Sequence, residues 1–391
     1  MIISITIIFV LLGVYLDFKA YSRISKAKIS KFIKYAYLSV VVVSYLLISS
    51  TPLVMYHFIN ENNSTFMMKF SMALLTVFLA LSVPRMLFNV MLLLSKKRFW
   101  MWTSVAVSSF MFIFFLYSIF VTRTDYNIKE VQLYYDNLPD GFDGYRLAFI
   151  SDIHIGTMLD AINELEGLFE MIDEAGVSAV FFGGDMVNVH HSEVDEYIQG
   201  VFSRLKPRDG VFMVFGNHDT GAYMKNSSEA KRSNNMASLE QKMQSTGWVV
   251  LRDSTVYIHK GGDSMAVTGI DYSEQLLKFR HSMDAVDSVE FGHIYNNVDC
   301  SLFNITISHL PHLWRTICDS SYSDLTLSGH IHAMQMKIGS FSPAKFMYKE
   351  WSGLYESDNC KLYINDGIGC VGYLARFGAR PEITVIELHR K

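Results

Sequence analysis

The stretch that decides the fold is RLAFISDIH, which runs from Arg146 to His154. Four apolar residues follow Arg146 and predict a short buried β-strand. Asp152 and His154, a carboxylate and an imidazole, come directly after this strand. Because a buried strand holds its end rigidly, the stretch predicts that both side chains are fixed at one edge of a sheet, where they can bind metal.

The same arrangement recurs four times further along the chain, with glycine beside the loops. The further apolar runs and the residues after them are 180–182 before Gly184 and Asp185, 211–215 before Gly216, Asn217, His218 and Asp219, 302–307 before His309, and 325–327 before Gly329, His330 and His332. Short β-like runs alternate with helical or polar segments throughout residues 123–391, which therefore predict an α/β catalytic domain.

The polar residues at these five strand ends form one chemically coherent ligand set. Carboxylate, imidazole and amide oxygen without thiolate suit Mn, Fe or Zn in a mixed nitrogen and oxygen site. Two such ions about 3.5–4 Å apart can share one carboxylate, as they do in phosphatases and nucleases. We therefore expect two divalent metal ions as cofactors.

In their order, these motifs resemble those of the calcineurin-like metallophosphoesterase superfamily, and within it the bacterial membrane-associated phosphoesterases. The resemblance spans about residues 146–369 and includes the later segments 351–355 and 363–369. It implies a four-layer α-β-β-α sandwich. Gln335 fits the family's ending, whereas Met334 stands where glycine is frequent, a departure that concerns the shape of the local loop.

The resemblance also implies a role for each residue. One ion would be held by Asp152, His154, Asp185 and His332, and the other by Asp185, Asn217, His309 and His330. Asp185 would bridge the ions, and His218 would assist the leaving group. A metal-bridging hydroxide would then attack phosphorus in line. The split of His330 and His332 between two ions requires the backbone to turn between them.

Two interpretations remain open for Asp219, and two for the pair His190 and His191. Asp219 either orients His218 or caps a helix, and the cap is favoured because aspartate after a strand is a common capping residue. His190 and His191 follow the second motif closely. A solvated loop is favoured for this pair over a role in substrate binding.

Two further segments are expected to shape access to the site. The polar insert 222–244 contains Lys225, Lys231 and Arg232. The stretch 341–351 is rich in aromatic residues, so it either forms an apolar rim that dips into a bilayer or packs on the core.

Residues 1–122 carry the apolar runs that predict a transmembrane region of about four helices. The runs extend over 2–16, 36–55, 66–94 and 99–121. The first is slightly short of the roughly 20 residues that a bilayer requires, and the other three reach or exceed that length. In the third run Arg85 either ends a shorter span or contacts a lipid phosphate.

Basic residues predict the orientation of this region. Six lysines and arginines lie between the first two runs, and Lys96, Lys97 and Arg98 follow the third, whereas residues 57–65 contain none. By the positive-inside rule, four spans with this pattern place both termini, and with them the catalytic domain, outside the cytoplasm. The expected protein is thus multi-pass, in the cell membrane if bacterial.

Charge and cysteine content narrow the function further. The net charge of −4, without a basic stripe, does not favour nucleic-acid binding. Cys300, Cys318, Cys360 and Cys370 lack metal-site spacing, so we expect mostly small buried side chains, with disulfides as the alternative.

We therefore expect a membrane-anchored phosphoesterase that hydrolyses phosphate esters, above all phosphodiesters of lipid or envelope origin. The alternatives are an inactive sensor or scaffold that uses the phosphoesterase fold, a phosphomonoesterase acting on soluble substrates, and a transporter with an accessory domain. The presence of every expected ligand argues against the inactive scaffold, and the few charges within the spans argue against the transporter.

Overall fold

The computed structural model describes residues 2–53, 64–94, 97–279, 292–296, 298–299, 301–357 and 360–391. The chain forms two compact units. The first consists of Met1–Ile59, Met67–Val121 and Gly372–Ala375, and the second of Asn60–Phe66, Thr122–Val371 and Arg376–Lys391. His57, Lys96 and Cys300, which the sequence analysis used, lie outside the described residues.

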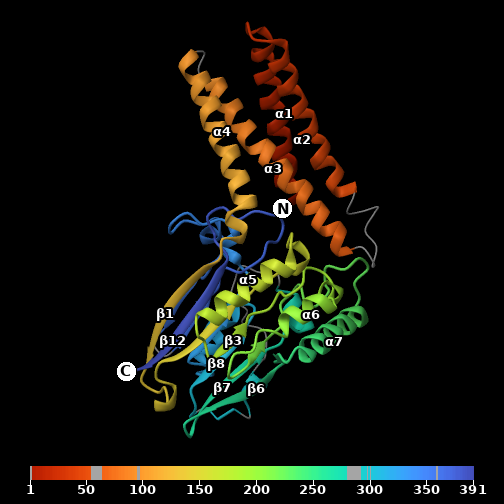
Figure 1. Cartoon of the computed structure of the whole chain (residues 1–391). Helices are drawn as coiled ribbons and strands as arrows, with labels where there is room; N and C mark the ends of the chain where they lie inside the picture. Colours follow the sequence, from red (N-terminus) through yellow and green to blue (C-terminus); the bar gives the residue numbers. More distant parts are fainter. Residues whose placement is uncertain are drawn as a thin grey trace. The chain divides into compact units, whose positions relative to one another are not determined.

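Four helices make up most of the first unit (Figure 1). They are α1 (Ile2–Lys26), α2 (Lys31–Leu53), α3 (Ser64–Leu94) and α4 (Arg98–Phe120). Within the described part of the chain, three segments are long and apolar enough to cross a membrane: Lys31–Thr51, Thr65–Leu94 and Phe99–Thr124. Helix α1 is not among them, so the number of spans stays a prediction.

A buried ion pair at Arg85 links α1 to α3. The Arg85 guanidinium lies 3.1 Å from the Asp17 carboxylate, which also accepts hydrogen bonds from the Tyr37 and Tyr45 hydroxyls and the Asn89 amide. Helix α3 continues past Arg85 to Leu94, and where a span would end stays a prediction. A charge in an apolar helix bundle is costly unless it is paired, and here Asp17 supplies the partner.

The second unit is built on two six-stranded sheets, with strand orders β1-β12-β2-β3-β4-β5 and β10-β11-β9-β8-β7-β6. The strands of the first sheet are β1 (Asn127–Tyr135), β2 (Tyr145–Ile150), β3 (Ala179–Phe182), β4 (Val211–Met213), β5 (Val249–Val250) and β12 (Glu382–Arg390). Those of the second are β6 (Ser254–Lys260), β7 (Asp263–Ile270), β8 (Asn304–Ser308), β9 (Leu325–Ser328), β10 (Gly353–Ser357) and β11 (Cys360–Ile364). Strands β2 to β5 run parallel, as do β7, β8, β9 and β11.

The two sheets pack face to face around a shared apolar core. Along β2, Leu147 and Phe149 face this core, where they meet side chains such as Ile305 of β8 and Leu327 of β9. Ala148 and the other alternate residues of β2 belong to a second core. This period of two follows from the pleat of a strand and shows that both faces of the sheet are buried.

Helices cover the outer faces of both sheets. They are α5 (Ala161–Glu174), α6 (Glu196–Phe202), α7 (Glu229–Ser245), the short α8 (Glu274–Leu277) and α9 (Trp314–Asp319). Apolar residues of α5, α6 and α7 pack on the first sheet, and Trp314 of α9 packs beside β11 of the second. The α/β sandwich expected from the sequence is confirmed.

A disulfide joins Cys318 at the end of α9 to Cys360 at the start of β11, with 5.8 Å between their Cα atoms. Cys370 is a buried free thiol. The expectation of mainly small buried side chains was therefore wrong for Cys318 and Cys360. The sequence does not show this pairing, because the two residues are separated by 42 positions and meet only through packing of the helix on the sheet.

Candidate metal centre

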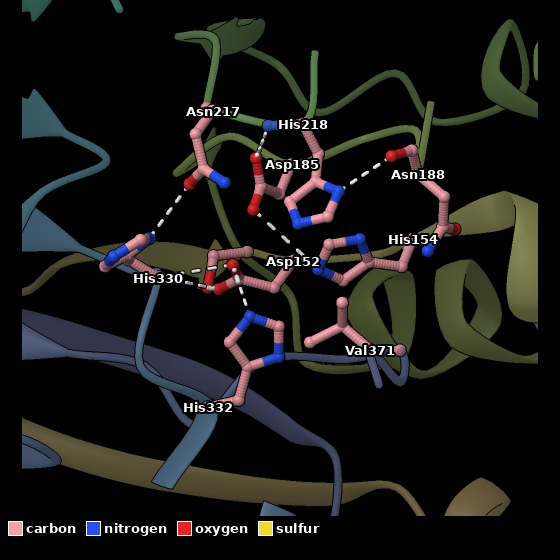
Figure 2. Close-up of polar contacts among 12 residues, drawn as sticks. Asp152, His154, Asp185, Asn188, Asn217, His218, His330, His332 and Val371 are labelled. Carbon is pink, nitrogen blue, oxygen red and sulfur yellow. Dashed lines mark hydrogen bonds and ion pairs between the residues drawn. The ribbon is translucent and has the colours of Figure 1, made fainter. Parts of the chain in front are cut away.

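The loops after five strands, three of the first sheet and two of the second, converge on one cluster of polar side chains (Figure 2). These are the strands β2, β3, β4, β8 and β9, whose carboxyl ends precede the residues singled out in the sequence. Seven side chains in and around the cluster are those predicted to bind metal: Asp152, His154, Asp185, Asn217, His309, His330 and His332. Parallel strands present their carboxyl ends at the same edge of a sheet, which explains the convergence.

One group of four side chains could hold a metal ion. Asp152, His154, Asp185 and His332 are all buried and offer ligand atoms within 4.8 Å of one another. Nε2 of His332 lies 2.9 Å from the Asp152 carboxylate, and Nε2 of His154 lies 3.8 Å from Oδ2 of Asp185.

A second group shares Asp185 and could hold another ion. Asp185, His309 and His330 offer ligand atoms within the same 4.8 Å limit. Nε2 of His309 lies 3.2 Å from Oδ2 of Asp185, the oxygen that also faces His154. Oδ1 of Asn217 adds an amide oxygen, 2.9 Å from Nδ1 of His330 and 3.1 Å from Nε2 of His309. Asp185 thus stands between the two groups.

Most of these residues adopt a left-handed backbone conformation that is uncommon outside glycine. The φ angle is 56° at Asp152, 48° at His154, 61° at Asp185, 75° at His330 and 52° at His332. Such conformations cost energy and persist where the surrounding structure enforces them, typically at functional sites. Between the two histidines of β9's loop the backbone turns sharply, which sends His330 toward Asn217 and His332 toward Asp152.

Glycine allows the loops to approach these side chains. A Cβ atom on Gly216 would collide with the Asp185 carboxylate, and one on Gly329 would lie 2.5 Å from Oδ2 of Asp152. Both positions therefore exclude any larger residue as long as the carboxylates keep their places.

The donor set fits metal ions better than it fits a metal-free protein. His154 is fully buried, yet neither of its ring nitrogens has a hydrogen-bond partner among the described residues. Buried polar atoms without partners are rare in native proteins, and a missing ion is one explanation for them. Burial and the neighbouring charge of His218 lower the pKa of His154 well below its ordinary value, so the ring is neutral and can act as a ligand.

His309 is oriented for the same purpose. Its Nδ1 donates to the carbonyl oxygen of Gly183 at 2.8 Å, so that Nε2 faces Asp185. Burial opposes protonation of this ring, but the charge and hydrogen bond of Asp185 outweigh it and raise the pKa of His309 to about 9. A metal ion at Nε2 would take the place of this proton.

His218 lies beside the two groups without belonging to either. Its backbone N–H donates to Oδ1 of Asp185 at 2.8 Å, and its Nδ1 donates to the carbonyl oxygen of Asn188 at 2.7 Å. The ring stacks on Tyr223, with 4.2 Å between ring centroids, and Tyr223 also accepts a hydrogen bond from the Asn217 amide. With Nδ1 held in this way, Nε2 is the nitrogen available for proton transfer.

Asp219 does neither of the things expected from the sequence. Its buried carboxylate accepts hydrogen bonds from the backbone N–H groups of Asp185, Val187 and Gly216, at 2.8, 3.0 and 2.9 Å. It therefore holds together the loops after β3 and β4, which carry Asp185 and Asn217. Both earlier readings, the helix cap and the partner of His218, were wrong.

Sequence reasoning missed Tyr223 and Asn188 altogether. Tyr223 lies in the polar insert 222–244, and no local sequence pattern marks its contact with His218. Asn188 acts through its backbone carbonyl, which carries no sequence signal. Arg232 of the same insert pairs with Glu274. Lys225 and Lys231 line a recess with His190 and His191, and the solvated loop favoured for this histidine pair stays a prediction.

The aromatic stretch 341–351 divides into two parts. Phe341 and Phe346 are 48% and 78% exposed, so packing on the core was wrong for them. Tyr348 and Trp351 are half-buried, as that reading expected. The Ser342 hydroxyl donates to the carbonyl oxygen of Ala333, the residue after His332, which ties the exposed part to the metal-binding loop.

Comparison with known proteins agrees with the geometry. Residues 145–334 match the family model of the calcineurin-like phosphoesterases. The uncharacterized metallophosphoesterase YkuE of Bacillus subtilis is 24% identical over 279 residues, which cover 68% of this chain and 85% of that protein. A transmembrane protein with a metallophosphoesterase domain from Danio rerio is 26% identical over 67% of this chain and 57% of its own length. An uncharacterized metallophosphoesterase of Helicobacter pylori is 25% identical, over 67% of this chain and 63% of that protein. The chain therefore carries a calcineurin-like phosphoesterase domain over residues 145–334.

Proposed function

We propose that this protein is a membrane-anchored phosphoesterase that uses two divalent metal ions to hydrolyse phosphodiesters of lipid or envelope origin. The observation that carries the proposal is the sharing of Asp185 by two groups of metal-binding side chains. When bound, two such ions would neutralise phosphate charge and supply an activated water as nucleophile. No protein nucleophile is then required.

The residues of this chain would hold the two ions and supply a proton to the leaving group. Asp152, His154, Asp185 and His332 would hold one ion, and Asp185, Asn217, His309 and His330 the other. His218, protonated on both ring nitrogens when the substrate is bound, would give the proton on Nε2 to the departing oxygen, since the Asn188 carbonyl and the Tyr223 ring fix its orientation. Identity of the metals as Mn, Fe or Zn follows from the ligand types alone.

Replacement of His218 by alanine tests the assignment of the acid. With Mn²⁺ and the full-length protein in detergent, we expect His218→Ala to lower kcat for an alkyl phosphodiester by about 10²–10⁴-fold, the usual contribution of a general acid. For a 4-nitrophenyl diester, whose leaving group needs no proton, kcat of the variant should be close to that of the wild type. Metal stoichiometry should stay that of the wild type.

The control for this variant is His259→Ala, because His259 is an exposed histidine on β6. It should leave both reporters unaffected. Equal losses of His218→Ala on the two reporters would contradict the role as acid. The inactive scaffold would be favoured instead if the wild type hydrolysed neither reporter and did not bind two equivalents of metal.

A lipid-borne substrate is favoured by the apolar residues beside the metal-binding loop. Ile338, Phe341 and Phe346 are 63%, 48% and 78% exposed, and the exposed lysines Lys345 and Lys349 lie next to them. Aromatic side chains flanked by lysine are typical of surfaces that enter the interfacial region of a bilayer. The membrane-capable helices of the same chain would keep this rim, residues 338–346, near a bilayer.

Substitution of the rim separates lipid from soluble substrates. We expect Phe341→Ser combined with Phe346→Ser to slow hydrolysis of a phosphodiester lipid in vesicles by on the order of tenfold or more, because each phenylalanine loses its apolar burial. Hydrolysis of a soluble diester should change less than about twofold. Tyr197→Ser, at a 77% exposed aromatic residue on α6, is the control. Equal effects on both substrates would contradict the lipid assignment.

We propose that the catalytic domain faces away from the cytoplasm. The arrangement of basic residues supports this orientation, and so does the Cys318–Cys360 disulfide, since such bonds persist in oxidising compartments. A topology reporter fused after Lys391 should be active only in its extracytoplasmic form. A cytoplasmic signal would contradict the proposal of four spans.

A further inference from the structure

A basic recess lies between the loop after β3 and helix α7, outside the two groups of metal-binding residues. Its volume is about 180 Å³, and its lining includes His190, His191, Met224, Lys225, Lys231 and Asn235. Residues of the lining on α7 recur at helical spacing and so present one face of that helix. None of the described residues that line the recess is acidic.

The recess shares its walls with the loop that carries His218. The Asn235 side chain donates to the carbonyl oxygen of Asp219 at 2.7 Å and accepts from the backbone N–H of His191 at 2.8 Å. Met224 directly follows Tyr223, whose ring stacks on His218. A group in the recess would therefore lie on the same side of the metal-binding cluster as the proposed acid.

The polar atoms around the recess suit an anion. Nδ1 of His190 accepts a hydrogen bond from the backbone N–H of Ser192, which fixes this ring at the edge of the recess. Nδ1 of His191 is buried and has no hydrogen-bond partner in the described part of the chain. Burial, followed by electrostatic repulsion from His190 and Lys242, lowers the pKa of His191 to about 4.

We infer that this recess is a subsite for a second anionic group, a phosphate or a carboxylate, on the leaving group of the substrate. The inference rests on the proposed function and narrows its substrate class. The reacting phosphate would occupy the metal-binding cluster, whereas the recess is lined by other residues beyond Tyr223. In the proposed mechanism His218 gives a proton to the departing oxygen. An anionic group bound next to the loop of His218 would therefore belong to the leaving group of the substrate. Lys225 and Lys231 supply the ammonium groups that bind it.

A matched pair of substrates tests this subsite. Methyl 3-carboxyphenyl phosphate and methyl 3-carbamoylphenyl phosphate share the reacting phosphodiester and differ in one negative charge on the leaving phenol. Full-length protein in detergent with Mn²⁺ would be assayed as wild type and as Lys225→Gln/Lys231→Gln. The double variant should lose roughly tenfold or more in kcat/KM for the carboxylate, since it lacks two charged donors, and less than about twofold for the amide.

The control removes the same charge elsewhere on the domain. Lys206→Gln/Lys278→Gln replaces two exposed lysines and should leave the ratio of the two substrates at its wild-type value. Lys225→Arg/Lys231→Arg keeps the charges and should retain most of the preference. An unchanged ratio in the glutamine variant, with both substrates still hydrolysed, would overturn the subsite alone. Hydrolysis of neither substrate by the wild type would overturn the proposed function and the subsite with it.

Discussion

Replacement of Asp185 by asparagine should abolish nearly all phosphodiester hydrolysis, with a fall in kcat/KM on the order of 10³-fold or more. Oδ2 of Asp185 faces both His154 and His309 and so stands between the two groups. A neutral amide oxygen is a much weaker ligand, so the variant should also lose one equivalent of bound Mn²⁺. Hydrolysis of a soluble diester and equilibrium metal binding by the full-length protein would measure both effects.

The asparagine variant should fold, because its side chain can still accept the hydrogen bond that the His218 N–H donates to Oδ1. Asp173→Asn is the matched control, since Asp173 is an exposed carboxylate on α5. Its activity and stoichiometry should equal those of the wild type. Activity of Asp185→Asn within tenfold of the wild type would contradict the bridging position.

Asp219→Ala should destabilise the catalytic domain more than any other single change at the site. The substitution leaves three buried backbone N–H groups without an acceptor, those of Asp185, Val187 and Gly216. An unsatisfied buried donor costs about 1–3 kcal/mol, so we expect a loss on the order of 3 kcal/mol or more. The melting temperature should then fall by roughly 6–12 °C. Activity should fall as well, because the loops that carry Asp185 and Asn217 lose their common acceptor.

Asp219→Asn provides the graded comparison, since its amide oxygen can still accept part of these hydrogen bonds and should cost less. Asp173→Ala, at the exposed site on α5, should shift stability by no more than about 0.5 kcal/mol. Thermal unfolding in detergent with and without Mn²⁺ would distinguish these cases. A melting temperature of Asp219→Ala equal to that of the wild type would show that the three hydrogen bonds are replaceable.

Local sequence predicted the part of the site that depends on strand ends. Each buried strand, such as β2 before Asp152, is marked by a short apolar run, and parallel strands bring their ends together whatever the residues between them. The class of the fold and the composition of the cluster could therefore be inferred without coordinates. The ligand roles themselves stay a proposal that rests on the resemblance and on the geometry.

What the sequence did not predict depends on backbone conformation and on distant contacts. Nothing in the letters around His330 and His332 shows that both residues adopt left-handed φ angles, yet this turn directs them to different groups. The role of Asp219 was not visible because the three N–H groups that donate to its carboxylate lie on two loops that only the fold brings together. Tyr223 and His218 lie on one loop, and it is the conformation of that loop that stacks their rings.

The membrane region shows the same limit. Asp17 follows the first apolar run, residues 2–16, and α1 continues through it to Lys26. The partner of Arg85 is thus separated from it by most of the helical unit, and the ion pair becomes visible only once α1 and α3 are packed. Hydropathy alone detects apolar length and cannot show which polar residues are paired.

The most direct test of the central claim is an electron paramagnetic resonance titration of the full-length protein with Mn²⁺. If two ions share Asp185, the spectrum at two equivalents should show an exchange-coupled pair, and Asp185→Asn should show only isolated ions. Saturation of the wild type at one equivalent, or isolated Mn²⁺ signals at two, would contradict a dinuclear centre built on Asp185.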